Sequence, residues 1–166
     1  MTVLLISLTI ILNLLLQSTV LPYFEILDKV PNTGLIIVVI IALAKGRYYG
    51  GLLGMLIGLL QDILFSTTIG VNSIIYFFAG YLIGYVEDTF ARDSLINIII
   101  FTALGTIYYN IFYSLYMYFL NRPVTFILAV KSVFSFEVIY NCIVAILLYK
   151  LFQKIISEPK IRFSKR

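Results

Sequence analysis

The sequence contains no histidine, no tryptophan and a single cysteine among its 166 residues. Without histidine the chain lacks the usual base near neutral pH and the commonest metal ligand in proteins. Cys142 alone cannot build a thiolate metal site or an intramolecular disulfide. The sequence also lacks a GxSxG elbow, a Walker-type phosphate loop and an HExxH motif. We therefore predict a protein that is not an enzyme and that binds no cofactor and no metal.

Charge is also scarce in this chain. Charged residues make up 12% of the sequence and hydrophobic residues 61%, and the mean hydropathy is +1.04. In a soluble domain about a quarter of the residues are charged. The composition therefore predicts an integral membrane protein. Because a spanning helix needs about 20 residues, the chain has room for at most six or seven spans and for little else.

Six apolar runs predict an all-α membrane protein, a bundle of six transmembrane helices. The runs are residues 1–24, 30–44, 48–65, 71–86, 94–121 and 126–152. The first run has no positive leader, which favours a retained helix over a secretory signal. The second run would cover only about 22 Å, so we expect it to thin the bilayer, to snorkel Lys45 or to be partly re-entrant. We predict one domain over residues 1–153 and a basic cytoplasmic tail over residues 154–166.

The distribution of basic residues predicts the orientation of the chain. Six spans place both termini on one side of the membrane. If that side is the cytoplasm, nine of the 12 basic residues lie inside, and only Lys29, Arg122 and Lys131 lie outside. This asymmetry follows the positive-inside rule. The tail is predicted to contact anionic lipid, whereas nucleic-acid binding has no aromatic or motif support.

Glycines recur at every fourth position in two neighbouring runs, and other residues extend the same spacing. The first ladder is Gly46, Gly50, Gly54 and Gly58, and it ends on Asp62; the second is Asn72, Tyr76, Gly80 and Gly84, and it ends on Asp88. A spacing of four places successive members on one slowly winding helical stripe. In lipid, such a stripe lets another helix approach closely. We predict that the ladders pack helices inside the protein and that a partner helix lies along any part that faces outward.

Several polar residues are predicted to lie inside the membrane. They are Gln17, Asp62, Asn72, Glu137 and Asn141. Gln17 belongs to a polar side of the first helix that could bond neighbouring helices. An intramembrane acid is a functional-site hypothesis by default, although Asp62 and Asp88 are also compatible with solvated helix ends. Glu137 and Asn141 share one helical face, so we expect Glu137 to find its partner on another helix or another protein. Together they would line a polar pocket, either structural or a relic of ligand binding.

Five segments carry a resemblance to a known family. They are LQSTVLP (residues 16–22), Pro31-Asn32, GGLLGMLIGLLQDIL (50–64), GVNSIIYFFAGYLIGYV (70–86) and EVIYNCIVAILLYK (137–150). Their order, spacing and total length resemble the rod shape-determining protein MreD family. The chain departs from the usual family pattern at Asn32, where Asp is common, and at Lys45, where Arg is common.

The resemblance implies a non-enzymatic inner-membrane subunit of the bacterial cell-elongation machinery. Members of this family bind the single-span protein MreC and, with it, link MreB filaments to RodA and a class B penicillin-binding protein. The family fold is similar to the substrate-binding subunits of energy-coupling-factor vitamin transporters, so a vitamin-capture subunit is the alternative function. Such a subunit would carry an Ala-x-x-x-Ala stripe on its first helix, but the first alanine here is Ala42.

Overall fold

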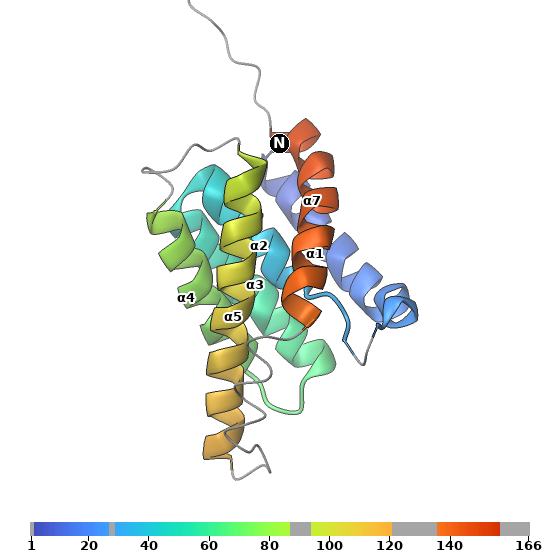
Figure 1. Cartoon of the computed structure of the whole chain (residues 1–166), viewed down its shortest axis with the longest axis vertical. Helices are drawn as coiled ribbons and strands as arrows, with labels where there is room; N and C mark the ends of the chain where they lie inside the picture. The colour runs from blue at the N-terminus through green and yellow to red at the C-terminus, as the bar shows by residue number, and fades with distance from the viewer. Residues whose placement is uncertain (1, 27–28, 87–93, 121–135, 157–166) are drawn as a thin grey trace, which may run out of the picture.

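The computed structural model describes residues 2–26, 29–86, 94–120 and 136–156, and within these ranges the chain is helical apart from short connections (Figure 1). The described α-helices are α1 (Thr2–Thr19), α2 (Thr33–Lys45), α3 (Arg47–Phe65), α4 (Val71–Tyr85), α5 (Leu95–Phe119) and α7 (Phe136–Ile156). A short 3-10 helix, η1 (Leu21–Phe24), follows α1. The first helix is therefore shorter than the predicted run 1–24. Asp88, Lys131, the predicted helix start at 126 and the tail from 157 lie outside the described residues.

Helix α2 forms the centre of the described bundle. Every residue from Thr33 to Leu43 is buried, and α2 contacts α1, α3, α4, α5 and α7, between which it lies in Figure 1. A helix that is hydrophobic all round belongs in a core or in a membrane. Because other helices surround α2, its residues from Thr33 to Leu43 contact protein. That the segment thins the bilayer, snorkels Lys45 or is partly re-entrant stays a prediction.

The two ends of α2 are closed by local hydrogen bonds. The side chain of Asn32 caps the start by accepting a hydrogen bond from the Leu35 amide at 3.1 Å, as expected of an asparagine at the N-cap. At the other end the amide of Gly46 donates to the carbonyl of Ala42 at 3.0 Å. Gly46 has a φ of 85°, which favours glycine, and it lets the chain turn at once into α3.

Large apolar side chains cover the outward faces of the bundle. On α3 and α4 they include Leu52, Met55, Leu56, Ile74, Phe78 and Leu82, which are 47% to 61% exposed. Soluble monomers rarely expose a contiguous apolar surface of this kind. Among the described residues, two helices, Arg47–Phe65 and Leu95–Phe119, are long and apolar enough to cross a membrane. The exposed shell is the surface that lipid tails would cover.

Candidate functional site

The two glycine ladders face each other in the antiparallel hairpin of α3 and α4. This pair makes the most extensive helix contact among the described residues. A Cβ atom added at Gly50 would lie 2.6 Å from the carbonyl oxygen of Gly80. A Cβ atom at Gly54 would overlap the carbonyl oxygen of Tyr76. Backbone therefore meets backbone, and no side chain fits between the helices at these positions.

The same register continues to both ends of the hairpin. A Cβ atom at Gly58 would lie 2.5 Å from the carbonyl group of Asn72, and one at Gly84 would lie 2.5 Å from the backbone of Arg47. Contacts thus advance by four residues along α3 as they retreat by four along α4. At each contact, a glycine of one helix lies against the backbone of the other helix. Small residues permit this close approach between membrane helices.

Helix α2 fills the groove that the hairpin leaves. A Cβ atom at Gly50 would lie 2.6 Å from the Cβ atom of Ala42, and one at Gly80 would lie 2.8 Å from a methyl group of Val38. Val38 and Ala42 are themselves four residues apart, so a third stripe meets the other two. The glycines of both ladders are buried except Gly46, which is half-buried in the turn. This geometry favours internal packing, and contact with a partner helix along the ladders stays a prediction.

Asp62 lies in α3, and its buried carboxylate caps the start of the next helix, α4. Its side chain is fully buried, so the alternative of a solvated boundary residue is wrong for this position. One carboxylate oxygen accepts hydrogen bonds from the amides of Gly70 at 2.9 Å and Ser73 at 3.2 Å, and the other accepts from the amide of Asn72 at 3.3 Å. These amides open α4, where a negative charge is favourable.

Asn72 and Tyr76 extend the polar contacts from α4 to its neighbours. The side-chain oxygen of Asn72 accepts a hydrogen bond from the Tyr109 hydroxyl at 3.0 Å, and its amide donates to Ser66 at 3.3 Å. The Tyr76 hydroxyl donates to the side-chain oxygen of Asn32 at 2.6 Å. The rings of Tyr76 and Tyr109 pack with centroids 5.7 Å apart. Helices α2, α4 and α5 are therefore joined by polar atoms inside an apolar bundle.

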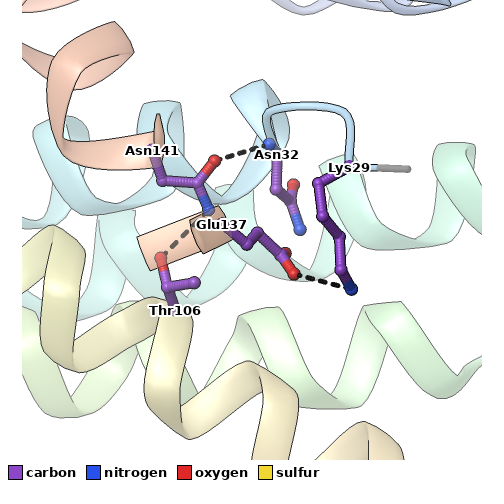
Figure 2. Close-up of polar contacts among 5 residues, drawn as sticks. All are labelled: Lys29, Asn32, Thr106, Glu137 and Asn141. Atoms are coloured by element: carbon purple, nitrogen blue, oxygen red, sulfur yellow. Dashed lines mark hydrogen bonds and ion pairs between the residues drawn. The ribbon is translucent and has the colours of Figure 1, made fainter. Parts of the chain in front are cut away.

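Asn141 connects α7 to this network, as Figure 2 shows. It is fully buried, and its side-chain oxygen accepts a hydrogen bond from the backbone amide of Asn32 at 2.9 Å. Its amide group donates to the Thr106 hydroxyl at 3.1 Å, and that hydroxyl donates to the carbonyl of Thr102 at 2.8 Å. One side chain of α7 thus contacts both the start of α2 and the middle of α5.

Glu137 lies one turn before Asn141 and pairs with Lys29 (Figure 2). Its carboxylate is 3.4 Å from the Lys29 ammonium, whose side chain is 41% exposed. The partner of Glu137 therefore lies in the segment that leads into α2, rather than on another helix. Because the polar groups of Asn141 bond the backbone of Asn32 and the side chain of Thr106, the geometry favours a structural role over a ligand pocket.

Gln17 is placed against α3. Its side-chain oxygen accepts a hydrogen bond from the amide of Gln61. Gly34 provides the room, since a Cβ atom there would lie 2.5 Å from that amide nitrogen. Three buried polar atoms have no hydrogen-bond partner among the described residues, namely the Asn13 amide nitrogen and the hydroxyls of Thr33 and Thr102.

Several network residues were absent from the predicted set. They are Asn32, Gln61, Tyr76, Thr106 and Tyr109, of which Tyr76 had been noted only as a member of a ladder. Asn32 follows Pro31, a pattern typical of a helix start, but this pattern did not predict the contacts of Asn32 with Tyr76 and Asn141. Tyrosines of membrane helices favour the membrane interface, but the Tyr109 hydroxyl of α5 bonds Asn72 inside the bundle. No periodicity distinguishes an inward tyrosine from an interfacial one.

A separate hollow of about 240 Å³ lies between α4 and α5. Its lining consists of Ala79, Leu82, Ile83, Val86, Phe101, Leu104, Gly105 and Tyr108. These side chains are apolar except for the tyrosine hydroxyl. The hollow therefore suits an apolar occupant better than a polar small molecule.

Comparison with known proteins identifies the family. The family model of the rod shape-determining protein MreD matches residues 1–158. The chain belongs to the MreD family. Neither a curated protein nor a solved structure matches it. MreD is a membrane protein of the MreBCD shape system, with a role in rod shape determination. The apolar shell of the described helices fits this assignment, and similarity to vitamin-transporter subunits stays a prediction.

Proposed function

We propose that this MreD protein is a non-enzymatic, multi-pass scaffold of the bacterial cytoplasmic membrane that binds MreC. Through MreC it would support lateral peptidoglycan synthesis in a complex with RodA, a class B penicillin-binding protein and MreB. The observation that carries this proposal is the family match over residues 1–158. Family membership assigns the shape system, and the partners named here follow from the resemblance described above.

The interior of the described bundle supports a scaffold. Its core is filled by α2, and buried polar groups such as Asp62, Asn72 and Asn141 bond to other parts of the same chain. The apolar outward faces are available to a membrane-embedded partner. A rigid core with an apolar exterior is what a single-span helix would need for recognition within the bilayer.

We further propose that residues 1–153 form one six-helix domain with both termini in the cytoplasm. The count of nine basic residues inside against three outside supports this orientation. The segment 154–166 would then lie at the inner leaflet, where its five basic residues attract anionic lipid.

Affinity purification from native membranes in mild detergent tests the scaffold. We expect tagged protein to capture MreC together with RodA and the penicillin-binding protein, and depletion of MreC to remove the other two from the eluate. An unrelated six-span protein with the same tag serves as the control. Capture of an ATPase pair with a bound vitamin, and no MreC, would instead identify the vitamin-capture function and end the scaffold proposal.

A further inference from the structure

The hollow between α4 and α5 is a concave part of the apolar shell of the described bundle. The two helices are in contact (Figure 1), but they pack less extensively than α3 and α4. Ala79 contributes one methyl group to the lining and Gly105 contributes no side chain, so a space of about 240 Å³ remains between the helices. An apolar cavity of about 150 Å³ is enough to hold a benzene ring. The hollow therefore has room for a large side chain of another molecule.

The floor and the rims of the hollow are already formed. A Cβ atom at Gly105 would lie 3.4 Å from a methyl group of Val39 and 3.5 Å from one of Ile83, so the floor belongs to the packed core. Leu82 of α4 and Leu104 of α5 lie at the rims, and their side chains are 51% and 53% exposed. In a preformed apolar pocket with apolar surroundings, a single anchor side chain can contribute much of the binding energy.

Tyr108 adds a polar group to this apolar lining. It lies next to the midpoint of α5 (Leu95–Phe119), and its ring packs against Phe112 with centroids 4.4 Å apart. Within the part of the chain that the structure describes, the Tyr108 hydroxyl makes no hydrogen bond. A hydroxyl without a partner in hydrocarbon is unfavourable, and lipid tails carry no polar atom that could bond it. A neighbouring transmembrane helix can supply one, because polar groups bond between helices in membranes.

We propose that the α4–α5 hollow is the docking site for the single transmembrane helix of the partner. One large apolar side chain of that helix fills the hollow, and a polar group of the same helix bonds the Tyr108 hydroxyl. This assignment rests on the proposed function, in which MreC supplies the single-span helix. The buried glycines of α3 and α4 then pack the protein's own helices, while α4 and α5 present the surface to the partner.

Site-specific photo-crosslinking in native membranes tests the position of the partner. A photoreactive benzoylphenylalanine replaces Leu82 or Leu104 at the rims, or the control Leu56, which is 49% exposed on α3. We expect cross-links to MreC from both rim positions and none from Leu56. Rim cross-links that reach only a second copy of this chain or only lipid would overturn the proposal. Cross-links to MreC that are equally strong from Leu56 would also overturn it.

Filling the hollow tests the anchor side chain. Ala79→Leu should weaken MreC binding by about tenfold or more, while the melting temperature of the free protein in micelles stays unchanged or rises, because cavity filling commonly stabilises a protein. Ala103→Leu is the control, since it makes the same change at a half-buried position of α5 outside the lining. Equal binding by Ala79→Leu and Ala103→Leu would contradict the anchor.

Removal of one hydroxyl tests the polar contact without changing the shape of the hollow. Tyr108→Phe should weaken MreC binding about threefold, whereas Tyr49→Phe, at an exposed position on α3, should bind as the wild type does. If the wild type captures MreC and Tyr108→Phe binds it equally tightly, the docking site is wrong and the scaffold stands. If the wild type captures no MreC, the scaffold proposal itself is wrong, and the docking site with it.

Discussion

At the scale of single residues, Asp62 shows that a polar side chain inside the bundle can serve an element other than its own. It lies near the end of α3, where a negative charge is unfavourable to that helix. Its carboxylate nevertheless accepts three amide hydrogen bonds at the start of α4. These amides have no partner within their own helix, so the carboxylate satisfies donors that would otherwise lack an acceptor.

Substitution of Asp62 tests this capping role. Asp62→Ala leaves buried amides without an acceptor, and we expect the free energy of unfolding to fall by about 2 kcal/mol or more. Asp62→Asn keeps one oxygen and should cost less. Unfolding in detergent micelles, followed by circular dichroism, measures both variants. Ile63→Ala, at a neighbouring exposed position, is the control, and an Asp62→Ala protein as stable as that control would contradict the role.

The Glu137–Lys29 pair should contribute modestly to stability. Lys29 is 41% exposed, so water competes for the ammonium and the coupling energy should be about 1 kcal/mol or less. A double-mutant cycle with Glu137→Gln and Lys29→Gln measures it, and high salt should reduce it. If Glu137→Gln and Glu137→Leu leave both stability and cell shape unaltered, Glu137 is merely tolerated.

At the scale of elements, the unit that organises the bundle is three helices that share one register. The ladders of α3 and α4 meet backbone to backbone, and Val38 and Ala42 of α2 close the groove. Glycine lowers the stability of an isolated helix by about 1 kcal/mol relative to alanine. At these positions glycine is nevertheless favoured over alanine, because the helices approach so closely that any side chain would separate them.

Gly54→Leu should therefore destabilise the folded protein. The added side chain would overlap the Tyr76 carbonyl, and such overpacking costs about 1 to 3 kcal/mol, more than the gain of about 1 kcal/mol in helix propensity. Unfolding in micelles measures the change, with the lipid-facing substitution Leu56→Ala as the control. Loss of MreC binding with unchanged stability would instead show that the ladder contacts the partner.

At the scale of the whole molecule, the described bundle has its glycine contacts and polar network inside, around the apolar helix α2, and further large apolar side chains on its outward faces. In water the exposed shell would aggregate, but in lipid it needs no cover. The hydrogen bonds of Asn72, Tyr76 and Asn141 then fix how the helices are rotated, because apolar surfaces alone do not select an orientation when the solvent is equally apolar.

The proposed orientation can be checked by labelling in a Cys142→Ser background. Glu25→Cys lies at an exposed position after η1 and should react with an impermeant thiol reagent in intact spheroplasts. Lys150→Cys, exposed near the end of α7, should react only after the membrane is permeabilised. The reverse pattern would invert the orientation. Labelling of both sites from outside would require an even number of spans between Glu25 and Lys150 and would contradict the five that are proposed.

Composition and run length were enough to predict a helical membrane protein, and four-residue spacing was enough to predict two packing stripes. These properties depend on transfer into lipid and on helix geometry, which are local in the sequence. Only the tertiary structure decided that the stripes face each other, that α2 is enclosed, and that Asn32 bonds Asn141, 109 residues away. Such pairings depend on the rotation and order of whole helices. No local pattern encodes these, because a helix face offers the same side chains to lipid, to a neighbouring helix or to a partner.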